Sequence, residues 1–194
     1  PFYVYYSMFG FQRIGDLAWA AGDMQARGFL LGGTSGRTTL NGEGLQHEDG
    51  HSHILANTIP NCVTYDPTFA HEVAVIMHHG MKRMVEQQEN VFYYITLLNE
   101  NYPMPGLTAG TEEQIIKGMY MCKPGAVPPQ GTSGASEKRV QLLGSGTILR
   151  ESIAAQTLLA ADWGIQADVW SCPSFNELTR EGQDAERWNL LHPL

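Results

Sequence analysis

The sequence predicts an α/β protein whose sheet is mostly parallel and flanked by helices. Apolar runs of strand length alternate with segments of helical periodicity along most of the 194 residues. Strands that alternate with helices in this way pair in parallel through right-handed crossovers. Apolar residues make up 43% of the chain and charged residues 16%, so the chain can bury a sizeable core.

The first strand, the first helix and the second strand follow one another closely. Residues 1–6 are aromatic and β-branched, which predicts a buried strand. Residues 8–27 predict a helix to which Met24 contributes apolar surface, and Gly28 ends that helix. Phe29-Leu30-Leu31 predicts a short buried strand that leads into a glycine-rich loop.

A further strand, helix and strand follow the loop. Residues 61–65 predict a strand, and Asp66-Pro67 predicts a helix start, with Asp66 as N-cap and Pro67 at the first helical position. Residues 91–98 form the clearest strand pattern of the sequence, with a loop over 99–106 after it. The helix between them is expected to pack one apolar face on the core, formed by Phe69, Val73, Met77, Met81 and Met84.

The composition changes at residues 123–138, which carry three prolines, three glycines and no apolar periodicity, so this segment is expected to be an exposed linker. Beyond it we predict one βαβ unit, with a strand at 140–143, a helix at 148–163 and a strand at 167–172. A single unit of this kind is too small to be a domain. The expected division is most of one α/β domain, a Pro/Gly-rich linker and the start of a second α/β domain, at residues 1–122, 123–138 and 139–194.

Both ends of the chain carry apolar sequence. Residues 1–6 and 188–194 are rich in aromatic and aliphatic side chains. Because natural termini are usually polar and frayed, we expect this chain to be a segment of a longer protein.

Charge and cysteine content exclude several classes of protein. Twenty acidic residues against twelve basic ones give a formal charge of −8, the wrong sign for a general nucleic-acid binder. No run approaches the roughly 20 apolar residues that span a bilayer, and the first residues lack a signal peptide pattern. The cysteines Cys62, Cys122 and Cys172 are odd in number and widely spaced, which fits a reducing compartment. We expect a cytoplasmic protein that binds neither nucleic acid nor membrane.

The loop at residues 32–53 is the most informative stretch for function. It contains six glycines, several acids and three histidines, and it follows a predicted strand, where open α/β sheets bind their ligands. Loops of this length without secondary structure are usually functional. Three kinds of chemistry remain open for it: phosphate binding, metal binding and proton transfer.

Phosphate binding has only partial motifs in its favour. The stretch from Gly28 to Gly33 has the spacing of a phosphate loop but lacks the lysine, and Gly42-x-Gly44 has His47 where a third glycine belongs. Another pair, Gly144-x-Gly146, follows a predicted strand, but Leu149 occupies the third glycine position.

Metal binding and proton transfer use the histidines and acids of the same loop. The possible metal ligands match no known ligand spacing, and they are His47, Glu48, Asp49, His51 and His53. His78 and His79 are adjacent on a predicted helix and diverge too far to share a metal. Glu43 and His47 are candidates for proton transfer, since histidine side chains exchange protons near neutral pH.

Four segments together resemble the homodimeric bacterial pyruvate dehydrogenase E1 component. They are Tyr5-Tyr6-Ser7-Met8-Phe9-Gly10-Phe11-Gln12-Arg13, residues 32–53, Leu98-Asn99-Glu100-Asn101-Tyr102 and Gly182-Gln183-Asp184-Ala185-Glu186-Arg187-Trp188-Asn189. The resemblance covers essentially the whole chain in order. It implies an incomplete transketolase-like pyrimidine-binding domain at residues 1–122, followed after the linker by the opening of a C-terminal domain.

The same resemblance implies roles for four residues. Phe9 matches an aromatic residue that packs on the aminopyrimidine ring of the cofactor, and Tyr6 matches a tyrosine that lines the cofactor's reactive face. His47 matches a histidine that reaches the bound pyruvate, and Glu43 matches a nearby acid. The candidate catalytic residues are therefore His47, Glu43 and Tyr6, and the candidate cofactor-binding residues are Phe9 and Tyr6; no metal ligand is assigned.

The family uses thiamine diphosphate with Mg²⁺ to decarboxylate pyruvate and transfers the acetyl group to the lipoyl group of an E2 acetyltransferase. The resemblance thus implies three partners: a second E1 subunit in a homodimer, E2 and pyruvate. The ligands of Mg²⁺ and of the diphosphate, and the glutamate that binds the aminopyrimidine, are expected outside this chain. The isolated chain is therefore expected to be inactive.

The residues alone leave two other hypotheses for the function open. One is a non-catalytic fragment or scaffold segment that keeps only the fold and an interaction surface. The other is a metalloenzyme built on the histidine-rich loop, which requires bound metal that His47→Ala removes.

Overall fold

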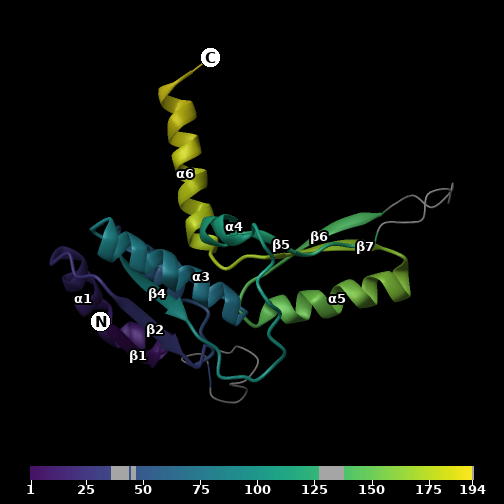
Figure 1. Ribbon diagram of the computed structural model, residues 1–194, viewed down its shortest axis with the longest axis horizontal. Helices are drawn as coiled ribbons and strands as arrows, with labels where there is room; N and C mark the ends of the chain where they lie inside the picture. The colour runs from purple at the N-terminus through teal and green to yellow at the C-terminus, as the bar shows by residue number, and fades with distance from the viewer. Residues whose placement is uncertain (36–43, 45–46, 127–137, 194) are drawn as a thin grey trace.

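The computed structural model describes residues 1–35, 44, 47–126 and 138–193, and for residues 6–9 it describes the backbone alone. The chain forms two sheets with helices packed on them, which confirms the predicted α/β class (Figure 1). No helix within these ranges is long and apolar enough to cross a bilayer.

The first sheet is parallel throughout. Within the described residues it has the strand order β1-β2-β4-β3. Its strands are β1 Phe2–Tyr6, β2 Phe29–Gly33, β3 Cys62–Tyr65 and β4 Phe92–Thr96. Every residue of β4 is buried, as expected for a strand that is covered on both faces and whose sequence is apolar without a break.

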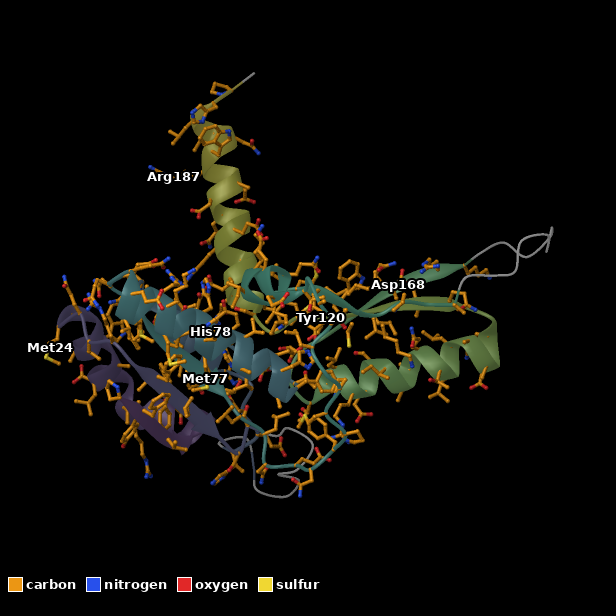
Figure 2. The ribbon with its side chains drawn as sticks, in the orientation of Figure 1. Met24, Met77, His78, Tyr120, Asp168 and Arg187 are labelled. Atoms are coloured by element: carbon orange, nitrogen blue, oxygen red, sulfur yellow. The ribbon has the colours of Figure 1, made fainter. Side chains whose placement is uncertain are left out.

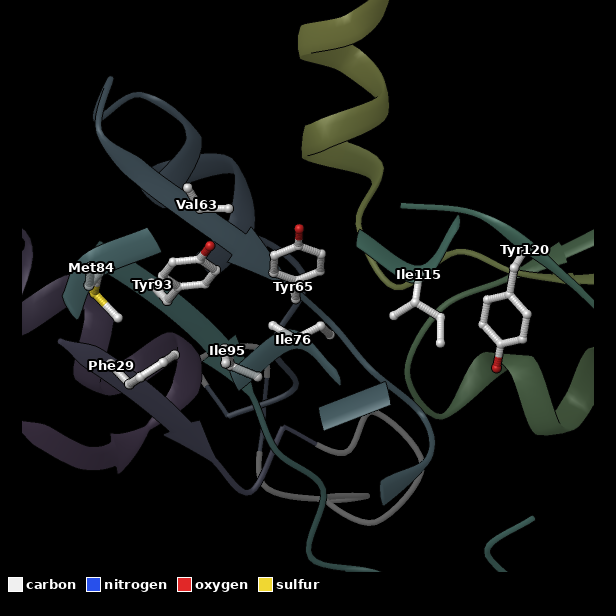
Figure 3. Packing of buried hydrophobic residues seen from close by; sticks show 9 residues of the cluster. All are labelled: Phe29, Val63, Tyr65, Ile76, Met84, Tyr93, Ile95, Ile115 and Tyr120. Atoms are coloured by element: carbon white, nitrogen blue, oxygen red, sulfur yellow. The ribbon is translucent and has the colours of Figure 1, made fainter. Parts of the chain in front are cut away.

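Helices cover both faces of this sheet. On one face, α1 (Ser7–Asp23) and α2 (Ser52–Asn57) pack over a cluster that includes Phe11, Phe92 and Tyr94. On the other face, α3 (Ala70–Met81) continues into the π-helical turn η1 (Lys82–Glu86). The cluster beneath α3 is shown in Figure 3 and consists of Phe29, Val63, Tyr65, Ile76, Met84, Tyr93, Ile95, Ile115 and Tyr120.

The second sheet contains the predicted βαβ unit. Strand β6 (Arg139–Gly144) runs parallel to β7 (Gln166–Ser171), and helix α5 (Ile148–Trp163) connects them, which confirms the expected elements. Strand β5 (Tyr120–Lys123), which the sequence pattern did not indicate, pairs antiparallel with β7. The division at residue 122 stays a prediction, and the pairing of β5 with β7 favours a boundary before β5.

Helices α4 and α6, like α2, were not predicted from the sequence. Helix α4 (Glu112–Lys117) is short, begins with two acidic residues and ends at Gly118 in a left-handed conformation. Helix α6 (Phe175–Leu191) projects away from both sheets (Figure 1), and none of its residues is buried. Its N-terminus is capped by the hydroxyl of Ser174, which accepts a hydrogen bond from the Glu177 N–H.

The expectation of a buried first strand is wrong for this chain. Phe2, Tyr3 and Val4 are 59%, 56% and 65% exposed. Strand β1 lies at the edge of its sheet and pairs, among the described residues, with β2 alone. Met24 is likewise exposed rather than part of the packed surface, and it lies at the outer edge of the molecule (Figure 2). Aromatic and branched residues predict a strand, but they do not determine whether another layer covers it.

The predicted start and apolar face of the third helix are also corrected. Helix α3 begins at Ala70 with Phe69 as N-cap, three residues later than Asp66-Pro67 predicts. Its buried positions are Glu72, Ile76 and Gly80, whereas Met81 is 44% exposed. Phe69 and Met84 of the predicted face are buried, and Val73 and Met77 are half-buried, so that face is wrong only at Met81. The buried residue that the sequence pattern did not indicate is the acid Glu72, whose hydrogen bonds are described below.

Candidate functional site

The carboxyl ends of the parallel strands bring the candidate residues to one edge of the first sheet. Strand β1 passes directly into α1, and Tyr6 lies in register with Gly33 at the end of β2. The backbone of Tyr6 and Phe9 therefore lies at the edge from which the glycine-rich loop leaves, which is where open α/β sheets bind ligands. Glu43 lies outside the described residues, and so do the side chains of Tyr6 and Phe9.

His47 sits in a tight backbone turn on the returning end of the loop. Its N–H donates to the Gly44 carbonyl at 3.1 Å, and its own carbonyl accepts from the Asp49 N–H at 2.9 Å. The residue is half-buried. The structure thus places His47 between the end of β2 and the start of α2.

Asp49 is buried, with 1% of its surface exposed, and it joins the two ends of the loop. Its Oδ2 accepts from the hydroxyls of Ser35, at 3.4 Å, and Ser52, at 2.6 Å. Its Oδ1 accepts from the Ser52 N–H at 3.1 Å, which caps helix α2. Sequence reasoning considered Asp49 only as a metal ligand; a short acid three residues before a helical N–H is the signal that could have revealed this cap.

His53 belongs to a different polar chain. Its Nε2 lies 2.9 Å from the Thr96 hydroxyl, which donates to Asp66 Oδ1 at 2.6 Å. Because a hydroxyl has one hydrogen, Nε2 of His53 is assigned as the donor to Thr96. The Ser145 hydroxyl completes the chain by donating to Asp66 Oδ2 at 3.0 Å.

This polar chain borders a cleft of about 260 Å³ between the two sheets. The lining residues come from the ends of β3 and β6 and from the starts of α5 and α6, and they include Thr64, Leu143, Ile148 and Phe175. His53 and Asp66 line it as well. Asp49 and His53 thus serve separate hydrogen-bond networks, and among the described residues no three His, Cys, Asp or Glu side chains gather as a metal site.

The Gly144-Ser145-Gly146 turn holds a carboxylate of the chain itself. The Gly146 N–H donates to the Asp66 carbonyl at 3.1 Å, and a Cβ at residue 146 would lie 2.7 Å from Asp66 Oδ2. The first N–H groups of α5 bond to the carbonyls of residues 145–147. A phosphate loop needs such N–H groups free to bind its anion, so this turn is arranged to hold Asp66 rather than a phosphate.

The buried Tyr94 and the half-buried Tyr5 both lie close enough to Asp49 for its charge to affect them. Burial raises the pKa of Tyr94 well above its usual value, and the negative charge of Asp49 raises it further. Burial likewise raises the pKa of Tyr5. Both phenols therefore keep their protons at neutral pH.

Two family models match this chain, one in each of its two parts. Residues 1–105, which contain the first sheet and the His47 loop, match the pyruvate dehydrogenase E1 component middle domain. The chain belongs to the pyruvate dehydrogenase E1 family. Residues 118–192, which contain the second sheet and α6, match the transketolase-like C-terminal domain.

Curated relatives match along the whole chain. The pyruvate dehydrogenase E1 component of Escherichia coli K12 is 66% identical over 195 aligned residues, and that of Pseudomonas aeruginosa is 64% identical over 193. The corresponding protein of Cupriavidus necator is 63% identical over 193. Each alignment covers 100% of this chain and 21% of the relative, so the chain spans about a fifth of the length of these proteins.

Solved structures of transketolases share the fold. The transketolase of Leishmania mexicana aligns with a TM-score of 0.66 at 15% identity, over 93% of this chain and 24% of that one. The transketolase of Campylobacter jejuni aligns with a TM-score of 0.65 at 17% identity, over 93% of this chain and 25% of that one. The expected transketolase-like fold is therefore confirmed.

Proposed function

We propose that this chain is part of a pyruvate dehydrogenase E1 subunit, which decarboxylates pyruvate with thiamine diphosphate and passes the acetyl group to the lipoyl group of an E2 acetyltransferase. The observation that carries the proposal is the 66% identity along the whole chain to a protein named as this component. The proposal includes a homodimer with a second E1 subunit, Mg²⁺ as cofactor and a cytoplasmic location.

The described residues fit the cofactor at the level of the backbone. The β1–α1 junction, with Tyr6 and Phe9, and the loop that carries His47 leave the same edge of the sheet. Phe9 would pack on the planar aminopyrimidine, a contact that contributes about 0.5–1.5 kcal/mol, and Tyr6 would line the cofactor's reactive face. Thiamine diphosphate, when bound, supplies the electron sink for decarboxylation.

His47 and Glu43 would handle protons on the substrate side. His47 is half-buried, and the turn that holds it limits its backbone freedom. A positioned histidine can donate a proton to an oxygen that gains negative charge, and Tyr6 would share that hydrogen-bonding role.

The test uses the full-length enzyme that contains this chain. We expect His47→Ala to lower kcat by about 10²–10⁴-fold, the usual contribution of general acid–base catalysis, while cofactor affinity changes little. Phe9→Ala should instead weaken cofactor binding by a few-fold to about tenfold, the loss expected for one stacking contact. Titration of the cofactor's circular-dichroism signal gives affinity, and steady-state kinetics give kcat.

His78→Ala serves as the matched control, because His78 is an exposed histidine on α3. It should leave both quantities unchanged. An unaltered kcat in His47→Ala would contradict the proposed role of His47. Loss of stoichiometric metal in His47→Ala would favour a metalloenzyme instead.

A further inference from the structure

Asp49 is a buried acid that the proposed chemistry does not use. It is 1% exposed and accepts hydrogen bonds from Ser35 and from both the hydroxyl and the N–H of Ser52. Burial of a carboxylate is costly unless donors of this kind replace its water. Because three donors surround this one carboxylate, we infer that its position is important for the fold or for the site.

The donors come from the two ends of one loop. Ser35 follows β2, and its N–H donates to the Leu97 carbonyl at the end of β4, so it is fixed to the sheet. Ser52 is the first residue of α2, which packs on the same sheet. A single carboxylate therefore joins the outgoing end of the loop, at Ser35, to its returning end, 14 positions later in the sequence.

The same residue fixes the backbone of His47. The Asp49 N–H donates to the His47 carbonyl, and the His47 N–H donates to the Gly44 carbonyl. This turn therefore ends at Asp49, whose buried side chain fixes that end to the rest of the fold. We propose that Asp49 is the positioning residue for His47, holding the histidine at the edge of the sheet without contacting the substrate. This inference rests on the proposed catalytic role of His47.

A competing account makes Asp49 only a cap of α2. A cap stabilises the helix and the protein, but its loss does not act through His47. The two accounts therefore differ in one measurable respect. If Asp49 acts by positioning His47, substituting Asp49 lowers kcat when His47 is present. The same substitution lowers kcat little further in a variant that already lacks His47.

The experiment is a double-mutant cycle in the full-length enzyme with Asp49→Asn, His47→Ala and both together. Asn keeps the shape of Asp49 but turns an NH2 group toward hydroxyls that now donate to a carboxylate oxygen. We expect Asp49→Asn to lower kcat by up to about 10²-fold, because a displacement of about 1 Å suffices for such a loss. In the His47→Ala background the further loss should stay within about twofold.

Amide hydrogen exchange of the peptide spanning residues 44–53 in the cofactor-free enzyme gives a readout besides activity. Exchange should become faster in Asp49→Asn and stay unchanged in Asp16→Asn, the same substitution at an exposed acid of α1. Asp49→Ala should show the same behaviour more strongly. Asp16→Asn should also keep wild-type kcat.

Several outcomes would overturn the inference. They are wild-type kcat in Asp49→Asn, losses that multiply in the double variant, unchanged exchange in residues 44–53, and loss of folding in both Asp49 variants, which would make Asp49 a support of the whole domain. Full activity in His47→Ala would instead remove the proposed function, while the exchange measurement would still report whether Asp49 fixes the loop.

Discussion

At the residue scale, Asp66 links three elements. Its N–H donates to the Pro173 carbonyl at 2.6 Å, and its carboxylate accepts from the hydroxyls of Thr96 and Ser145. Asp66 therefore ties the end of β3 to β4, to the turn before α5 and to the segment before α6. This explains why Asp66 does not cap α3, since its side chain is already engaged elsewhere.

Gly146 is required for this arrangement. Its φ is +52°, a left-handed conformation, and a Cβ there would lie 2.7 Å from Asp66 Oδ2. We expect Gly146→Ala to lower the unfolding free energy by about 1–3 kcal/mol, because the backbone becomes strained and Asp66 must move. Chemical denaturation of the chain measures this change.

Gly182→Ala is the control for Gly146→Ala. Gly182 lies in the exposed helix α6, and a Cβ there would meet no atom within 4 Å. Alanine is the better helix former by roughly 0.5–1 kcal/mol, so this variant should gain stability. Equal effects of both substitutions would show that the approach of Asp66 to Gly146 is unimportant.

At the element scale, α3 joins the two sheets through Glu72. This acid is 0% exposed, and its Oε2 accepts from the N–H groups of Thr68 and Phe69. Its Oε1 accepts from the hydroxyl of Tyr120 on β5 at 2.7 Å and from that of Ser171 on β7 at 2.6 Å. One carboxylate thus caps a helix of the first unit and receives two donors from the second.

Glu72→Ala should strongly destabilise the chain. The substitution leaves four buried donors without their acceptor, and each such donor costs about 1–3 kcal/mol, so we expect a loss of at least about 3 kcal/mol. Because the donors lie in both units, we also expect the two units of Glu72→Ala to unfold in separate transitions. Urea denaturation followed by tryptophan fluorescence and by circular dichroism tests both effects.

Glu113→Ala provides the comparison for Glu72→Ala. Glu113 pairs with Lys117 on the surface of α4, with 79% of its side chain exposed. Its loss should hardly change the unfolding midpoint, because exposed ion pairs contribute little. A Glu72→Ala variant that unfolds like Glu113→Ala would show that Glu72 does not join the units.

At the scale of the whole molecule, the two sheets form one polar junction. The Tyr65 hydroxyl donates to the Ile116 carbonyl, and the Thr68 hydroxyl donates to the Gly146 carbonyl. Arg180 of α6 donates to the Cys62 carbonyl at the start of β3. These contacts join the first sheet to the elements that follow it in the chain.

The isolated chain should be inactive. It spans 21% of its relatives, and by resemblance the residues that bind Mg²⁺ and the diphosphate, together with the acid that binds the aminopyrimidine, belong to the rest of the subunit. We expect no cofactor-dependent CO₂ release from pyruvate when the purified chain is supplied with thiamine diphosphate and Mg²⁺. The full-length subunit, assayed alongside, should release CO₂; release by the chain alone would refute this expectation.

The sequence by itself determined the alternation of strands and helices that gives a mostly parallel sheet, the βαβ unit of the second sheet and the family. These features depend on local periodicity and on long stretches of identity, both of which are written along the chain. It also located the loop that carries His47, because glycines and histidines after a strand are visible without a structure.

Only the tertiary structure decided the roles of Asp49, Asp66 and Glu72. Their partners come from distant parts of the chain, such as Ser145, which is 79 residues from Asp66, and Ser171, which is 99 residues from Glu72. An acidic residue in a sequence predicts exposure, and it is buried only where folding brings enough donors to replace its water. The exposure of β1 was likewise decided by the tertiary structure. Whether a strand is buried depends on which helices or strands pack against it, and its own residues do not determine this.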